Sequence, residues 1–204
     1  MSLRSTNTAI PNSLLTRLRQ ETAQSHQALE DSICIEQRIQ NVPLYRELLE
    51  KFYGYYAPLE VAIEAVPGWE MWNLNFSERR KRPSLVQDLK ALGLDDAEID
   101  ALPVCTELPE VDTIAAGFGC AYVLEGSTLG GRHISAMLDR SEIPQNARSF
   151  FKSYGSDVGL KWKEFLAALE NFSETNLSPE LTVNAAENTF TYLQVWMSEG
   201  DNPS

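Results

Sequence analysis

Histidine and cysteine are scarce in this chain of 204 residues, which contains two histidines, His26 and His133, and three cysteines. A di-iron site of the ferritin type needs two Glu-x-x-His pairs, but Ala23 and Gly130 stand three positions before the histidines. Because the chain has only two histidines, a catalytic zinc held by three histidines is excluded. An odd number of cysteines without a Cys-x-x-Cys pair argues against a disulfide framework or a zinc knuckle, and it predicts a reducing, cytoplasmic location.

Basic charge is also in short supply. The chain has 17 lysine and arginine residues against 29 aspartate and glutamate residues, which gives a net charge of −12. This is the wrong sign for a surface that neutralises phosphates, so a nucleic-acid partner is not expected. The one basic run, Arg79 to Arg82, is predicted to be a solvated loop ahead of a helix. Docking of an acidic protein on this run stays open as an alternative.

Long apolar runs are missing as well. The longest, Ala115 to Leu124, is interrupted by glycines and is too short to cross a bilayer. The N-terminus lacks the apolar core of a signal peptide, so no membrane association is expected. With 204 residues, 43% of them apolar, the chain is predicted to form one compact domain. Residues 1–12 are expected to be a flexible lead-in, and residues 13–199 the folded domain.

Apolar residues recur at spacings of three and four, and the sequence contains neither an alternating strand pattern nor a long repeat. This pattern predicts an all-α, single-domain bundle of about eight helices. Helices are expected over residues 13–33, 42–66 with a bend or break at Pro58, 83–93, 95–103, 112–142 capped by Asp112, 145–154, 157–172 and 179–198. Residues 69–76 are expected to be irregular.

His26 falls on the apolar face of the first expected helix, and Arg19 lies seven residues earlier. Seven residues are two helical turns, so both side chains point within about 20° of one direction. A single histidine can serve as one axial ligand of a haem iron, and an arginine at this spacing can bind a carboxylate at the edge of a flat ligand. Glu30 is placed to orient the His26 ring or to face solvent. The alternative, which spacing alone favours, is a core histidine beside a solvated arginine.

A second unusual segment, Tyr122 to Gly131, places Gly126, Gly130 and Gly131 within a helical run. Each glycine costs a helix about 1 kcal/mol relative to alanine, so close approach of a ligand or of another helix must compensate. Both explanations stay open. The segment lacks the lysine of a phosphate-binding loop, and it is neither a G-x-G-x-x-G motif nor a Gly-x-Ser-x-Gly elbow. Trp162, at helical spacing, is expected to lie in the core.

These residues resemble a known family. Leu18 to Glu30, LRQETAQSHQALE, resembles the proximal helix of haem oxygenases. Tyr122 to Gly131, YVLEGSTLGG, resembles the distal helix of their bacterial, biliverdin-producing branch, the type associated with bacteriophytochromes. Phe150 to Gly155, which leads into Gly159 to Trp162, and Ala186 to Phe190 agree with the same family. The resemblance spans nearly the whole chain, and the two walls of one pocket follow in the family's order.

The resemblance implies that haem b lies between these two helices of an all-α fold. His26 is then the proximal iron ligand. The distal, catalytic wall is implied to consist of Gly126, Ser127, Gly130 and Gly131. Further haem contacts are implied for Arg19, Tyr122, Lys163 and Phe190, with Arg19 and Lys163 at propionate-binding positions.

Two positions depart from the family pattern. Ser127 stands where animal haem oxygenases carry an aspartate that organises the distal water, so a hydroxyl or the surrounding backbone would take that role. His133 stands near a position that is apolar in the bacterial branch. It either reaches the distal side as a second ligand or proton donor, or lies one turn beyond the pocket.

The activity that the resemblance implies is oxidative cleavage of haem, which is both cofactor and substrate, to biliverdin, carbon monoxide and ferrous iron with O2. Because no flavin or nicotinamide fingerprint is present, electrons are expected from a partner such as ferredoxin or flavodoxin with its reductase. A bacteriophytochrome is a candidate recipient of the biliverdin. Two alternatives remain: a non-enzymatic haem carrier or sensor on the same fold, and a helical enzyme that binds another small molecule, such as a thiamin-type pyrimidine.

Overall fold

The computed structural model describes residues 13–175 and 178–198, and every regular element within these ranges is helical. The α-helices are α1 (Leu14–Glu21), α2 (Ala23–Ile33), α3 (Ile35–Arg38), α4 (Val42–Ala65), α5 (Arg82–Ala91), α6 (Asp96–Asp100), α7 (Ile114–Leu138), α8 (Ser149–Lys152), α9 (Val158–Thr175) and α10 (Pro179–Ser198). Short 3-10 helices are η1 (Trp69–Trp72), η2 (Phe76–Arg79), η3 (Gln145–Ala147) and η4 (Gly155–Asp157). The all-α prediction is confirmed, whereas the predicted lead-in, residues 1–12, lies outside the described residues.

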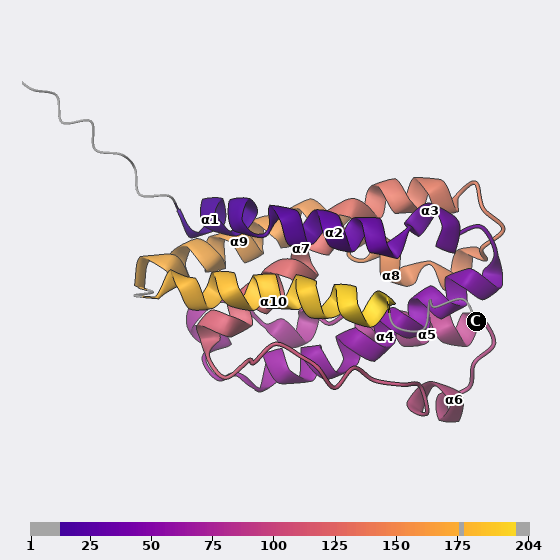
Figure 1. Ribbon diagram of the computed structural model, residues 1–204, viewed down its shortest axis with the longest axis horizontal. Helices are drawn as coiled ribbons and strands as arrows, with labels where there is room; N and C mark the ends of the chain where they lie inside the picture. The colour runs from indigo at the N-terminus through magenta and orange to yellow at the C-terminus, as the bar shows by residue number, and fades with distance from the viewer. Residues whose placement is uncertain (1–12, 176–177, 199–204) are drawn as a thin grey trace, which may run out of the picture.

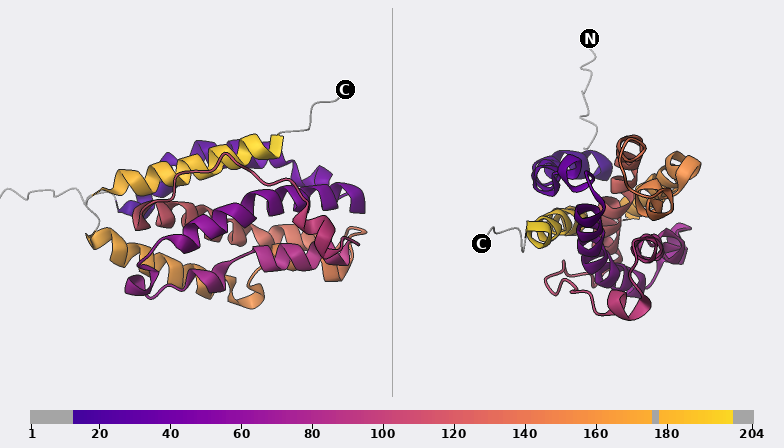
Figure 2. Two further views of the ribbon diagram at one scale, coloured as in Figure 1. Left: turned by 90° about the horizontal axis from the view of Figure 1, so that it is seen from below. Right: turned by 90° about the vertical axis from the view of Figure 1, so that its right-hand side faces the viewer.

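The long helices form an elongated bundle (Figure 1). Several of them are seen nearly along their axes in the end-on view of Figure 2. α10 packs against both α7 and α2, while α4 packs mainly against α5. α2 and α7 are therefore held apart on a common neighbour, and this arrangement determines where the cavity described below can form.

The first predicted helix is divided at Thr22, which has φ −90° and ψ −1° and separates α1 from α2. The Thr22 hydroxyl donates to the Leu18 carbonyl at 2.7 Å. This bond back to the preceding turn bends helices, and periodicity alone does not reveal it. The predicted start is confirmed, because Ser13 caps α1 by accepting a hydrogen bond from the Thr16 N–H.

Pro58 lies within α4 and does not break it, so of the expected bend or break at this residue the break is excluded. Proline has no N–H, so the carbonyl of Gly54, four residues earlier, loses its helical donor. The backbone N–H of Cys105 donates to that carbonyl at 2.9 Å. A Cβ atom on Gly54 would lie 2.5 Å from the Pro103 carbonyl oxygen, so only glycine allows this segment to approach α4.

Other predicted boundaries are corrected locally. Residues 69–76 are not irregular throughout, because they include η1 and the first residue of η2. The helix expected over residues 145–154 is divided into η3 and α8, with Arg148 between them. α7 is capped by Thr113, whose side chain accepts from the Ala116 N–H, and not by Asp112.

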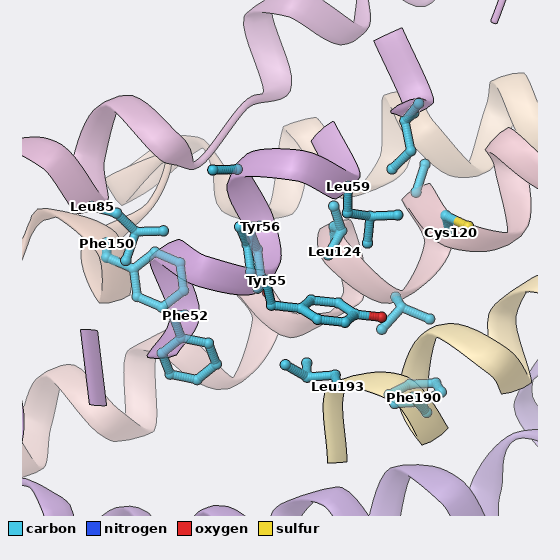
Figure 3. Close-up of a cluster of buried hydrophobic side chains, with 14 of the residues drawn as sticks. Phe52, Tyr55, Tyr56, Leu59, Leu85, Cys120, Leu124, Phe150, Phe190 and Leu193 are labelled. Atoms are coloured by element: carbon cyan, nitrogen blue, oxygen red, sulfur yellow. The ribbon is translucent and has the colours of Figure 1, made fainter. Parts of the chain in front are cut away.

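The core joins α4, α7 and α10 and is rich in aromatic side chains. The Tyr55 hydroxyl of α4 donates to the Thr189 carbonyl of α10 at 2.8 Å, and Figure 3 shows its ring in the middle of this cluster. α7 approaches α10 closely at Gly119, where a Cβ atom would overlap the carbonyl oxygen of Thr182. The three cysteines form no disulfide, as predicted.

Candidate active site

A cavity of about 580 Å³ lies between α2 and α7, a volume typical of small-molecule sites. α10 closes one side with Phe190 and Leu193. The other apolar and aromatic residues that line the cavity come from five helices, α2, α4, α7, α8 and α9: Leu29, Ile33, Phe52, Tyr56, Tyr122, Val123, Leu129, Ile134, Phe150, Phe151 and Trp162. The cavity is therefore mainly apolar, with a few polar groups on its walls.

His26 carries the polar chemistry of the α2 wall. Its side chain is 52% exposed, so it borders the cavity and is not the core histidine of the alternative explanation. The ring meets the Phe190 ring edge-on, with centroids 5.4 Å apart. Nδ1 lies 3.7 Å from Glu30 Oε2, which leaves Nε2 for a ligand. A carboxylate near the other ring nitrogen is the arrangement that orients metal-binding imidazoles. Arg19, from α1, lines the same cavity.

The wall opposite His26 belongs to α7, which stays helical through its glycines. Its lining residues include Tyr122, Gly126, Ser127, Gly130 and Gly131. A Cβ atom on Gly130 would meet nothing within 4 Å, and one on Gly126 would meet only Trp162, at 3.9 Å. A Cβ atom on Gly131 would instead overlap the Phe151 carbonyl oxygen. Gly126 and Gly130 thus leave space in the cavity, whereas Gly131 serves helix packing.

A pair of hydroxyl groups connects α7 to α4 at the cavity. Tyr56 Oη lies 3.3 Å from Ser127 Oγ. Because Ser127 donates its own proton to the Leu124 carbonyl at 2.8 Å, Tyr56 is the donor in the pair. Burial raises the pKa of Tyr56 to about 12, so the phenol keeps its proton at neutral pH.

Aromatic rings of α4 and α8 hold Tyr56 in place. The Phe52 and Phe150 rings have centroids 5.0 Å apart, and the Tyr56 and Phe150 rings meet nearly at right angles with centroids 5.5 Å apart. Figure 3 shows the three side chains in one part of the buried cluster. Edge-to-face contacts of this kind fix ring positions, so this side of the cavity is rigid.

A buried ionic cluster lies directly behind the α7 wall. Glu125, whose side chain is 1% exposed, has Arg79 Nη1 2.5 Å from Oε2 and Lys81 Nζ 2.8 Å from Oε1. The Tyr154 hydroxyl donates to Glu125 Oε1 at 2.7 Å. Burial lowers the pKa of Lys81, and the attraction of Glu125 opposes this shift. Because Glu125 immediately precedes Gly126, the cluster fixes the register of α7 beside the cavity.

The same cluster corrects the prediction that Arg79 to Arg82 is a solvated loop. Arg79 and Lys81 are 5% and 4% exposed, whereas Arg80 and Arg82 face the surface. The run alternates between inside and outside because Glu125, far away in the sequence, supplies a buried carboxylate. The part of this run that a protein partner can reach is therefore much smaller than the sequence suggests.

The structure brings most of the predicted site residues together at the one cavity: Arg19, His26, Tyr122, Gly126, Ser127, Gly130, Gly131 and Phe190. It does not bring Lys163 there, since this residue is exposed on α9 and does not line the cavity. The neighbouring Trp162, expected in the core, packs against the core and also lines the cavity. His133 is exposed beyond the cavity, which agrees with the second of its two predicted positions.

Sequence reasoning missed the lining residues of α4 and α8, above all Phe52 and Tyr56. α4 is buried on most sides, and such a helix shows no separate ligand-binding face in its sequence pattern. The available signal was a tyrosine within an apolar helix, because a buried phenol must find a hydrogen-bond partner.

Two structural features are absent from residues 13–175 and 178–198. These ranges contain no helix long and apolar enough to span a bilayer. They also contain no group of three or more histidine, cysteine, aspartate or glutamate side chains that could hold a metal ion. A metal that arrives with its own ring of ligands needs only one histidine from the protein, and His26 is the histidine that borders the cavity.

The fold and site define a helical protein with a mainly apolar cavity between a histidine-bearing helix and a glycine-rich helix. The family model described as Heme oxygenase matches residues 12–199, so the chain belongs to the haem oxygenase family and is an enzyme of that class. It is 26% identical over 162 residues to a heme oxygenase of Xanthomonas campestris pv. campestris (strain 8004), covering 78% of this chain and 92% of that protein. The structure of a heme oxygenase from Leptospira interrogans has the same fold, with a TM-score of 0.72 and 20% identity over 92% of this chain and 99% of that one.

Proposed function

We propose that the cavity between α2 and α7 binds haem b and that the protein cleaves it there, with O2 and external electrons, to biliverdin, carbon monoxide and ferrous iron. The observation that carries this proposal is the position of His26. Its ring borders a mainly apolar cavity of about 580 Å³, with Glu30 near Nδ1 and the α7 glycines on another wall. Membership of the haem oxygenase family supports the same reaction.

On the α2 side, His26 Nε2 would hold the haem iron. The Phe190 edge and the Glu30 carboxylate restrict rotation of its ring from two sides. Arg19, at the α1 end of the cavity, binds a carboxylate side chain of the haem. A guanidinium is suited to this role because it forms two parallel, charge-assisted hydrogen bonds with a carboxylate.

On the α7 side, bound haem supplies the iron at which oxygen is activated, and the chain supplies space and protons. Gly126 and Gly130 keep side chains away from the haem face, and Tyr122 borders the same wall. The Tyr56 and Ser127 hydroxyl oxygens, 3.3 Å apart, offer hydrogen-bond acceptors at the cavity. They take the place of the aspartate of the animal enzymes by orienting water.

The proposed electron donors, cellular location and recipient of biliverdin are argued from the sequence and the state of the cysteines. The sequence has no nucleotide-binding fingerprint of its own, so the electrons come from a ferredoxin or a flavodoxin with its reductase. We also propose a cytoplasmic location, in keeping with three cysteines that form no disulfide. Membership of the bacteriophytochrome-associated branch, with biliverdin passing to a bacteriophytochrome, rests on the resemblance of Tyr122 to Gly131.

Titration with haemin, followed by reductant in air, tests the proposal. A stoichiometric complex is expected, and its haem absorption should decay into that of biliverdin when catalase is present. Catalase removes free hydrogen peroxide, so decay that persists comes from oxygen handled within the cavity. A haem complex that survives reduction unchanged would mean that the protein is a haem carrier or sensor instead. Absence of a complex would show that haem is not the ligand of the cavity.

His26→Ala identifies the iron ligand, and His133→Ala is its matched control. The first variant should lose the axial histidine signature of the haemin spectrum and all turnover. The second should behave as wild type, because His133 lies outside the cavity. Equal spectra for wild type and His26→Ala would contradict the assignment.

A further inference from the structure

Ser153 is a cavity residue that the proposed mechanism does not use. It lies between α8 and η4 and lines the cavity. Within residues 13–175 and 178–198, only Ser153 Oγ and Thr182 Oγ1 are buried side-chain oxygens without a hydrogen-bond partner. Thr182 does not line the cavity. An unpartnered buried hydroxyl is destabilising, so Ser153 calls for a physical explanation.

The backbone at Ser153 carries a second cost. Ser153 has φ 47° and ψ −120°, and Tyr154 has φ −79° and ψ 6°. These are the angles of the two central residues of a type II′ turn, whose first central position favours glycine. A serine backbone is strained in this conformation. Glycine would remove both the strain and the unpartnered hydroxyl, so the serine is explained only if its hydroxyl finds an acceptor in another state of the protein.

The turn is held on both sides and cannot relax by itself. Tyr154 is fixed by its hydrogen bond to Glu125 at 2.7 Å. On the other side, Phe151 packs through its carbonyl against Gly131. Ser153 is thus kept at the cavity wall by neighbours whose positions are fixed by other contacts.

Lys81 is a cationic residue that also lines the cavity, but its ammonium has no free N–H group to donate to a ligand. Its ammonium has three N–H groups. They are used by the Arg79 carbonyl at 2.6 Å, Glu125 Oε1 at 2.8 Å and the Tyr154 hydroxyl at 2.6 Å. The Ser153 hydroxyl is therefore a donor on this part of the wall that no protein group uses.

We propose that Ser153 donates a hydrogen bond to an oxygen atom in the occupied cavity and is thereby a further positioning residue for the ligand. Its Oγ is buried and unpartnered, and rotation about χ1 to another staggered well would present it to the cavity that Ser153 lines. The acceptor is a haem carboxylate or a water molecule trapped beside the haem. This inference rests on the proposed function, because that function makes haem the ligand.

Haemin titrations of Ser153→Ala, Ser153→Gly and wild type test the inference, with Thr182→Val as the matched control. Both Ser153 variants should bind haemin about threefold to tenfold more weakly, the value of one net hydrogen bond. Thr182→Val removes the other unpartnered hydroxyl and should bind as wild type. In thermal unfolding without ligand, Ser153→Gly should melt above Ser153→Ala, because glycine relieves the strained turn.

The dimethyl ester of haemin separates the two acceptors. If a haem carboxylate accepts the bond, the difference between Ser153→Ala and wild type should disappear with the ester. If a water molecule accepts it, the difference should persist. Wild-type affinity in Ser153→Ala, in a protein that otherwise binds haemin, would overturn the role of Ser153 and leave the proposed function intact. A wild-type protein that bound no haemin would overturn both.

Discussion

Gly131 and Phe151 lie so close that one added carbon atom on the glycine would overlap the carbonyl oxygen of the phenylalanine. Gly130, the preceding residue, faces open space in the cavity wall. Two consecutive glycines therefore have different functions. The first leaves room for a ligand, and the second lets α8 pack against α7.

Leucine substitutions should separate these functions. Gly130→Leu is expected to fold with wild-type or higher stability, since glycine disfavours helix interiors by about 1 kcal/mol, and to block haemin binding. Gly131→Leu should instead lower the free energy of unfolding by about 1–3 kcal/mol or more, because α8 must shift. Denaturant unfolding and haemin titration of both variants provide the measurement. Equal stability losses in the two would show that the wall is tightly packed at both positions.

The cluster around Glu125 predicts a large and local stability effect. Glu125→Gln leaves Arg79 and Lys81 buried with one carboxylate fewer, and breaking such a pair costs about 3–5 kcal/mol. Glu164→Gln is the control, because Glu164 also pairs with Arg79 but is 43% exposed, and its loss should cost about 1 kcal/mol or less. The urea concentrations at the unfolding midpoints of the two variants and of wild type provide the measurement. Similar midpoints for the two variants would mean that water reaches the cluster.

Arg19 should control how the haem sits in the cavity. Arg19→Ala is expected to change the mixture of biliverdin isomers, because the haem loses the charge that holds one carboxylate. Lys163→Ala should leave the mixture unchanged, since Lys163 lies outside the cavity. Chromatography of the products compares the two. An altered mixture from Lys163→Ala alone would restore that lysine to the site and remove Arg19 from it.

The three thiols should react with alkylating reagents at very different rates. Cys34 is exposed, whereas Cys105 and Cys120 are buried. Burial also raises the pKa of Cys120 to about 11, so the reactive thiolate is rare at neutral pH and increases only toward that value. Mass spectrometry of the native protein at pH 8 should therefore find rapid modification of Cys34 alone. Rapid labelling of Cys120 would mean that the contact between α7 and α10 opens readily.

Local sequence patterns were sufficient for most of the helices. They singled out His26 and the glycines of α7, but spacing alone favoured a core histidine and left the role of the glycines open, so the family resemblance was needed to assign them to two walls of one cavity. The start of α6 near residue 95 was also predicted, and there Asp95 and Glu98 form a capping box, which depends only on neighbours within one turn.

Features set by distant residues could not be predicted in this way. Pro58 is tolerated because Cys105 donates to the carbonyl that proline leaves unpaired. Arg79 and Lys81 are buried because Glu125 meets them from another helix. In each case the deciding partner lies more than forty residues away in the chain, beyond the reach of any local pattern.

The two principal walls of the cavity come from different parts of the chain. α2 lies in the first half, α7 in the second, and the stretch between α6 and α7, residues 101–113, contains no helix. A ligand that touches both walls binds only the docked arrangement, so it adds RT ln(1 + [L]/Kd) to stability, about 2.7 kcal/mol at a concentration of 100 Kd. Haem would thus stabilise the enzyme that consumes it, and each completed turnover would return the protein to its less stable, ligand-free form.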